Sequence, residues 1–189
     1  MKFKFWLLIS LLVLVSSCQK ENQDQFLPYI NLTVDGKSFK IDSVLAVYDD
    51  SAQVMTLIGA KYTDGRLFST IAIGFKFSTG MQIPKTYDAT KKPIELFAIY
   101  VDSAEAVYST ATIDSMLNPS EPIGTGVLNL TYHNLQLHKI AGDFNLRLKE
   151  IDPNTYEPKT KLIQITGSFQ TYYAFLVTGS PPPRPLKIK

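Results

Sequence analysis

The chain has 189 residues, of which 45% are hydrophobic, 12% aromatic and 19% charged, a composition typical of one globular domain. Without the first seventeen residues, the Lys and Arg fall from 19 to 17 because Lys2 and Lys4 are removed, and they equal the 17 Asp and Glu. The lysines of this neutral chain are scattered, and phosphate backbones require clustered positive charge, so no nucleic acid partner is expected.

The amino terminus has the features of an export signal. Lys2 and Lys4 form a charged start, and residues 6–15 are apolar apart from Ser10. This apolar run is about half as long as the roughly 20 residues that a membrane-spanning helix needs. We therefore predict a signal peptide over residues 1–17, with a short uncleaved anchor as the alternative.

The residues at the end of this signal, Leu14-Val15-Ser16-Ser17-Cys18, resemble the bacterial lipobox, in which a cysteine after small residues receives a diacylglycerol thioether. Cys18 is the only cysteine of the chain, so no disulfide can form within it. The resemblance implies lipidation of Cys18 and attachment to a membrane through the N-terminal lipid. In the alternative interpretation, Cys18 ends an ordinary signal peptide and carries no lipid.

Residues 18–27 are expected to form a flexible tether, because the stretch after the cysteine is polar and lacks apolar periodicity. Lys20-Glu21 is similar to the signal that sends lipoproteins of the Bacteroidota to the cell exterior, although Asn22 stands where a second acid is usual. This resemblance implies an outer-membrane, lipid-anchored protein exposed on the cell surface. The alternative is a protein that faces the periplasm.

Residues 28–178 are expected to form a single all-β domain, an antiparallel β-sandwich or open barrel of about nine or ten strands. Short runs rich in β-branched and aromatic residues alternate with turn signals, without convincing helical periodicity. Asp35-Gly36 and Asp64-Gly65 each separate two such runs and predict two hairpins. The expected strands cover residues 30–34, 37–41, 54–62, 67–77, 94–101, 106–112, 126–130, 140–148 and 162–177, with a break over 113–122. The proline-rich residues 179–189 are expected to form a disordered tail.

No cofactor-binding or metal site is predicted. His133 and His138 are five residues apart and would lie on opposite faces of an unbroken strand, so we expect surface histidines. A zinc site needs three or four convergent ligands. Asp49-Asp50 lacks the glycine and the spaced acids of a calcium-binding loop and is expected in a solvated turn.

No catalytic residue is predicted either. The chain has no Gly-x-Ser-x-Gly elbow, and Gly167-Ser168 lies within an expected strand. Three acids, Glu95, Glu105 and Glu150, show no local arrangement typical of paired catalytic carboxylates. A triad assembled from distant Asp, His and Ser residues stays an open alternative.

Tyrosines of the domain could form a sugar-binding surface. The single tryptophan, Trp6, is lost with the signal peptide, whereas Tyr132, Tyr172 and Tyr173 could stack on a sugar ring. Because aromatic residues in a sheet more often pack against the core or against cross-strand neighbours, we expect packing. Tyrosines that share one exposed face would instead favour glycan binding.

Four Asp-Ser triplets resemble the O-glycosylation sequence of exported Bacteroidota proteins, in which Asp is followed by Ser or Thr and a small or aliphatic residue. The resemblance implies modification at Ser43, Ser51, Ser103 and Ser115. Asp-Ser is also common turn chemistry, since both side chains bond to their own backbone. The two interpretations are compatible because glycans need exposed turns.

The chain as a whole resembles small Bacteroidota outer-membrane lipoproteins of unknown function. The resemblance rests on the lipobox, on residues 34–39 (VDGKSF), and on two similar segments, 140–144 (IAGDF) and 165–169 (ITGSF). That family has no assigned chemistry to carry over, and we expect a lipid-anchored, non-enzymatic module for surface binding, adhesion or envelope structure, with a glycan or protein ligand that the sequence does not identify. The alternatives are a glycan-binding accessory lipoprotein and a hydrolase or lipocalin-like carrier.

Overall fold

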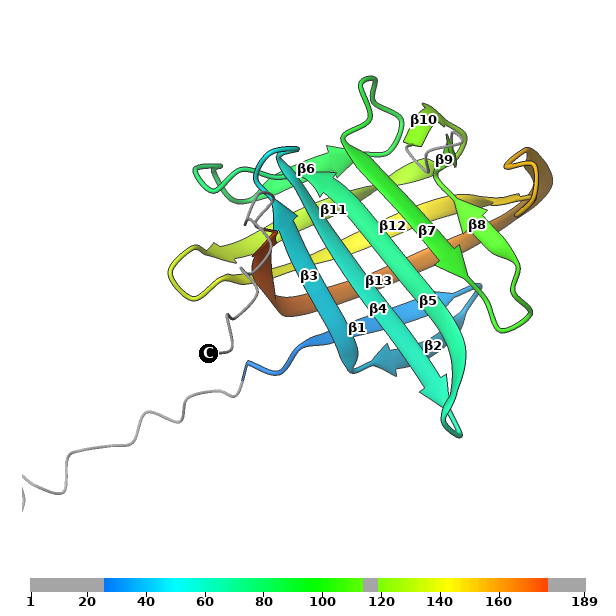
Figure 1. Ribbon diagram of the computed structural model, residues 1–189, viewed down its shortest axis with the longest axis horizontal. Helices are drawn as coiled ribbons and strands as arrows, with labels where there is room; N and C mark the ends of the chain where they lie inside the picture. Colours follow the sequence, from blue (N-terminus) through cyan, green and yellow to red (C-terminus); the bar gives the residue numbers. More distant parts are fainter. Residues whose placement is uncertain (1–25, 114–118, 177–189) are drawn as a thin grey trace, which may run out of the picture.

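The computed structural model describes residues 26–113 and 119–176, so the predicted signal peptide, Cys18 and the proline-rich tail lie outside the described residues (Figure 1). The all-β prediction is confirmed, but the strands number thirteen instead of nine or ten. They are β1 (Tyr29–Val34), β2 (Lys37–Ile41), β3 (Ser43–Asp49), β4 (Val54–Thr63), β5 (Arg66–Lys76), β6 (Lys85–Asp88), β7 (Leu96–Val101), β8 (Val107–Ser109), β9 (Ala111–Ile113), β10 (Pro119–Pro122), β11 (Thr125–Asn134), β12 (Lys139–Ile151) and β13 (Pro158–Leu176).

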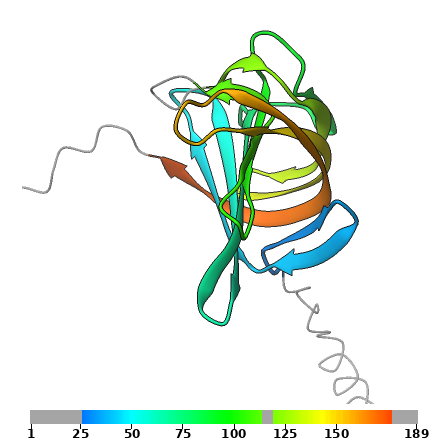
Figure 2. The same cartoon turned by 90° about the vertical axis from the view of Figure 1, so that its right-hand side faces the viewer.

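Two layers of strands form the fold. The first layer has the order β2-β1-β13-β12-β11-β6, and the second has the order β3-β4-β5-β7-β8. β12 and β13 extend beyond the first layer, where Lys149–Ile151 pair with β8 and Tyr173–Leu176 pair with β3. The layers are therefore joined along both sides, as the view in Figure 2 shows. The pairing of β13 with β3 is parallel, so the expectation of an antiparallel sheet is wrong at this one junction.

Both predicted Asp-Gly hairpins are confirmed. β1 pairs with β2 around a turn in which Asp35 and Gly36 have φ angles of 45° and 83°. β4 pairs with β5 around Asp64 and Gly65, with φ angles of 52° and 73°. A tight hairpin turn needs this left-handed backbone at both central residues, and Asp and Gly adopt it at low cost.

The missed strands lack a clear local signal. A single residue, Asp42, separates β2 from β3, and the first residues of β3 belong to an Asp-Ser triplet that suggested a turn. β6 and β10 have four residues each, and β10 contains two prolines. Because β6 and β10 are short and polar, they are recognised as strands only through their pairing, β6 with β11 and β10 with β9.

The space between the layers is filled by aromatic side chains. The largest fully buried rings are those of Tyr48, Tyr87, Tyr108, Phe75, Phe77 and Phe169. A lipocalin-like carrier holds its ligand in a cavity inside the sheet, and in this structure side chains occupy that position.

Two glycine–phenylalanine pairs lie across β12 and β13. Gly142 is opposite Phe169 and Phe144 is opposite Gly167, so the two similar IxGxF segments meet in antiparallel register. A methyl group at Gly142 would collide with the Asn129 backbone oxygen and press on the Phe169 ring, and one at Gly167 would collide with the Asn31 backbone oxygen and press on the Phe144 ring. The repeated sequence pattern therefore has a packing role, in which each phenylalanine covers the glycine of the other strand.

Candidate functional site: a tyrosine-lined sheet face

Three tyrosines lie on the outer face of the first layer. In register across four strands, Tyr132 is opposite Ala141, Ala141 is opposite Gln170, and Gln170 is opposite Tyr29. Tyr172 is two residues from Gln170 along β13, so its side chain leaves the same face. Tyr132 and Tyr172 are 41% and 44% exposed. We call these five residues, Tyr29, Tyr132, Ala141, Gln170 and Tyr172, the tyrosine face.

A β-bulge directs Tyr132 outward. Leu130 pairs with Gly142 and Tyr132 pairs with Ala141, which leaves Thr131 as an extra residue in β11. In a regular strand, the alternation that begins at the buried Leu130 would turn Thr131 outward and Tyr132 toward the core. The bulge therefore places Tyr132 on the tyrosine face and turns the next residue, His133, inward.

A row of polar side chains borders the tyrosine face, two residues further along the central strands. The row, called the polar row below, crosses five strands in register and consists of Thr86, Asn129, Asp143, Ser168 and Asn31. The Thr86 hydroxyl donates to Asn129 Oδ1 at 2.8 Å, and Asn129 Nδ2 donates to Asp143 Oδ1 at 2.9 Å. These amide and hydroxyl groups offer donors and acceptors to a ligand with many hydroxyl groups.

The segment before β1 reaches the tyrosine face. Two residues that the sequence assigns to the tether, Phe26 and Leu27, contact the domain there. The Phe26 ring meets the Tyr172 ring edge-on with 5.1 Å between centroids, and the Lys139 ammonium lies 4.6 Å from the Phe26 ring centroid. Gln170 Nε2 donates to the Leu27 carbonyl oxygen at 2.9 Å. A ring and a carbonyl oxygen of the chain itself therefore occupy part of this surface.

The expectation of packed tyrosines holds for one of the three residues that sequence reasoning singled out. Tyr173 is buried with 3% exposure, whereas Tyr132 and Tyr172 are exposed. Sequence reasoning missed Tyr29, Gln170 and the polar row. The alternation of polar residues along each strand could have placed them on one face, but the register between strands could not be read from the sequence.

The two histidines meet at Tyr173 and do not lie on opposite faces. The prediction of surface histidines is confirmed for His138 and wrong for His133, which is half-buried. His133 Nε2 lies 3.0 Å from the Tyr173 hydroxyl, and its ring lies 4.9 Å from that of Phe77. The His138 ring lies 5.3 Å from that of Tyr173, because the turn between β11 and β12 interrupts the strand. Burial lowers the pKa of His133 below its ordinary value.

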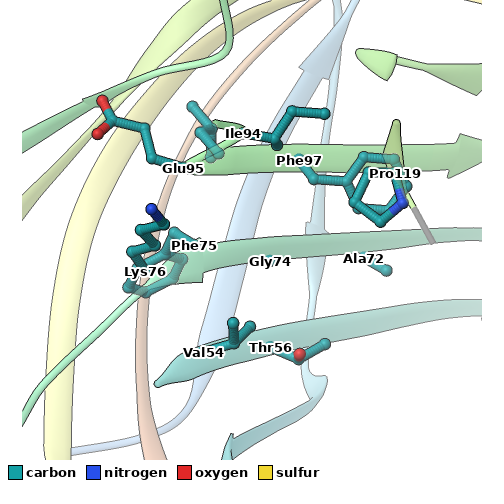
Figure 3. Close-up of a pocket in the computed structure, with 11 residues that line it drawn as sticks. Val54, Thr56, Ala72, Gly74, Phe75, Lys76, Ile94, Glu95, Phe97 and Pro119 are labelled. Atoms are coloured by element: carbon teal, nitrogen blue, oxygen red, sulfur yellow. The ribbon is translucent and has the colours of Figure 1, made fainter. Parts of the chain in front are cut away.

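The second layer carries an apolar groove of about 300 Å³ on its outer face (Figure 3). Its lining includes Val54, Thr56, Ala72, Gly74, Phe97 and Pro119. Gly74 is at its floor, where an added Cβ would meet no atom within 4 Å. Lys76 and Glu95 lie at the same end of the groove in Figure 3. The groove belongs to the other layer and shares no residue with the tyrosine face.

The predicted modification sites that the structure describes are exposed. Ser43, Ser51 and Ser103 are all exposed, and Ser115 lies outside the described residues. Asp49 Oδ1 accepts hydrogen bonds from the Ser51 backbone N–H at 2.9 Å and from the Ser51 hydroxyl at 2.6 Å. The carboxylate that makes these bonds is Asp49, at the end of β3, and not Asp50 of the Asp-Ser triplet, so the turn predicted at Asp49-Asp50 begins at Asp50.

The carboxylates considered for catalysis have separate local surroundings. Glu95 Oε1 accepts a hydrogen bond from the backbone N–H of Asp88 at 3.1 Å, and Glu150 forms an ion pair with Lys159 at 3.2 Å. Glu105 lies in a turn with a φ angle of 62°. Ser168 lies within β13, as expected, and belongs to the polar row.

Within residues 26–113 and 119–176, no group of three or more His, Cys, Asp or Glu side chains is arranged to hold a metal ion. The same two segments contain no helix of the length and hydropathy that would cross a membrane. Comparison of the chain with protein-family models, with curated proteins and with solved structures finds no match.

Proposed function

We propose that this protein is a lipid-anchored, non-enzymatic binding module of the outer membrane, displayed on the cell surface, and that its tyrosine face binds glycan chains. The observation that carries the proposal is the presence of three tyrosines on one outer sheet face beside a hydrogen-bonding polar row. Cys18 would hold the lipid, and Ser43, Ser51, Ser103 and Ser115 would carry O-linked glycans on the protein itself.

The chemistry of the tyrosine face suits a sugar ring. Tyrosine presents an apolar ring face and a wet hydroxyl, which matches a ligand with apolar C–H faces and polar edges. Tyr132 and Tyr29 are separated by two intervening strands, about 14 Å at the usual strand spacing, so a chain of linked sugars could span the row between them. Gln170 and the polar row would then bond to its hydroxyl groups.

The test is binding of the full-length, detergent-purified protein to an array of bacterial and host glycans, followed by titration of the strongest ligand. Tyr132→Ala, which does not touch Phe26, is expected to weaken binding about tenfold, as truncation of a central aromatic contact typically does. Tyr62→Ala is the matched control, because Tyr62 is 55% exposed but lies on β4 in the second layer.

The Gly74→Val variant distinguishes the two surfaces. Its added side chain fills the apolar groove and leaves the tyrosine face unchanged. Loss of glycan binding in Gly74→Val, with full binding retained in Tyr132→Ala, would move the site to the groove. Binding of a protein ligand with no glycan ligand would also contradict the proposal.

A further inference from the structure

The tyrosine face carries its own occupant, the residues that precede β1. Phe26 and Leu27 lie outside the strands, and Tyr29 is the first residue of β1 that pairs with β13. The contacts described above hold these two residues: the Phe26 ring on Tyr172, the Lys139 ammonium over the Phe26 ring, and the Gln170 amide on the Leu27 carbonyl oxygen. Each of these contacts uses a side chain of the face and none belongs to the β1–β13 ladder, so the segment can detach without opening a strand pair.

The occupant uses the groups that a sugar would use. Tyr172 supplies an exposed aromatic ring, Gln170 supplies an amide donor, and the Lys139 ammonium lies 5.3 Å from the Tyr172 ring centroid as well. Phe26 offers a flat apolar ring and Leu27 offers a hydrogen-bond acceptor. A sugar ring with an apolar face and a hydroxyl oxygen has the same two features. A sugar and the Phe26-Leu27 segment therefore cannot contact Tyr172 and Gln170 at the same time.

We propose that Phe26 is a displaceable plug of the tyrosine face, and that a bound glycan expels it from Tyr172 and frees the segment that leads to the predicted lipid anchor. This inference rests on the proposed glycan-binding function and adds its regulation. Without ligand, the plug covers the face in most molecules. The apparent affinity for glycan is therefore the affinity of the open face multiplied by the fraction of molecules in which the face is open. For one aromatic pair with one cation–π contact, this factor is about tenfold.

The first measurement uses the full-length protein with the array-selected glycan. Phe26→Ala is expected to bind about tenfold more tightly than wild type. Leu27→Ala is the matched control, because it keeps the carbonyl oxygen that Gln170 contacts and removes a side chain that is 56% exposed. Its affinity is expected to equal that of the wild type.

The second measurement reports on the plug itself. Trp6 lies in the predicted signal peptide, so Phe26→Trp introduces the only tryptophan of the processed chain. Its emission is expected to shift to longer wavelength when glycan binds. Adding Tyr172→Ala to Phe26→Trp is expected to give the same shift without ligand, whereas adding Tyr62→Ala is expected to leave the emission unchanged.

The outcomes separate the two proposals. If glycan binds but the affinity of Phe26→Ala and the emission of Phe26→Trp do not change, the plug is overturned and the glycan-binding function stands. If neither wild type nor Phe26→Ala binds any glycan, both proposals fail. Binding by Phe26→Ala alone, with none by wild type, would support both.

Discussion

Glycine has opposite consequences at different positions of these sheets, depending on what lies above it. Gly142 and Gly167 lie under phenylalanine rings of the neighbouring strand, where their missing side chains make room for Phe169 and Phe144. Gly74 lies at the floor of the apolar groove, with open space above it. The same residue type is therefore required by packing in β12 and β13 and replaceable in β5.

This contrast predicts opposite stability changes. Gly142→Ala and Gly167→Ala are each expected to lower the free energy of unfolding by about 1–3 kcal/mol, because the added methyl group overpacks the core. Gly74→Ala is expected to raise it by about 0.5–1 kcal/mol, because alanine loses less backbone entropy on folding. Urea denaturation measures the change in the free energy of unfolding of each variant relative to the wild type. Equal changes in all three variants would contradict the packing role.

His133 is predicted to make stability depend on pH. Burial holds its folded-state pKa below the ordinary value of 6.5, which the unfolded chain keeps. The unfolded state therefore takes up the proton first as the pH falls below about 6.5, and the free energy of unfolding decreases down through the folded-state pKa.

Denaturation of wild type and His133→Gln between pH 7.5 and about 5 tests this dependence. Glutamine can keep a hydrogen bond to the Tyr173 hydroxyl without titrating. The free energy of unfolding of His133→Gln is therefore expected to fall less with decreasing pH than that of the wild type. His138→Gln removes the exposed histidine and serves as the control. An unchanged pH slope in His133→Gln would show that other groups carry the dependence.

At the scale of elements, the β1–β2 hairpin combines a local turn with a long-range contact. Its turn is also tied to the end of the chain, because Asp35 exchanges two hydrogen bonds with the backbone of Gln164 on β13, at 3.0 and 2.9 Å. A local signal, Asp-Gly between two alternating runs, therefore sets a turn that also helps to place a strand distant in sequence.

Substitution of Gly36 tests the geometry of this turn. Its φ angle of 83° lies in the left-handed region, so Gly36→Ala is expected to lower the free energy of unfolding by about 1–2 kcal/mol. Gly80→Ala is the control, because Gly80 lies in a turn with open space around its Cα and without a positive φ angle. Thermal and urea unfolding measure the difference, and equal stabilities would contradict it.

At the scale of the whole molecule, the tyrosine face and the groove lie on different layers of one closed fold, and the tether meets the domain at the tyrosine face. The described chain begins at Phe26 on the tyrosine face, and the groove lies on the other layer. The proposed lipid at Cys18 would therefore connect to the domain beside its proposed ligand site.

The anchor is tested by mass spectrometry of the mature amino terminus and by protease treatment of intact cells. The wild type is expected to begin with an acylated Cys18 and to be removed from whole cells by external protease. Cys18→Ala is expected to lose the acyl groups and the membrane attachment, because the thioether has no acceptor. An unmodified wild-type terminus would contradict lipidation, and full protection from protease would place the domain in the periplasm.

Local sequence chemistry determined the strand class of this domain and both Asp-Gly hairpins. Alternation with a period of two and a left-handed turn are properties of neighbouring residues, so they can be read without knowledge of the fold. Short polar strands such as β6 gave no comparable signal, since their stabilisation comes from the strand beside them.

Only the tertiary structure decided where the candidate site lies. Tyr29 and Gln170 are neighbours through pairing between the two ends of the domain, and a one-residue slip would have turned each tyrosine to the other face. The bulge at Thr131, the inward position of His133 and the contact of Phe26 with Tyr172 depend on the same long-range register. Register is set by the packing of the whole core, and residues far apart in sequence carry no local record of it.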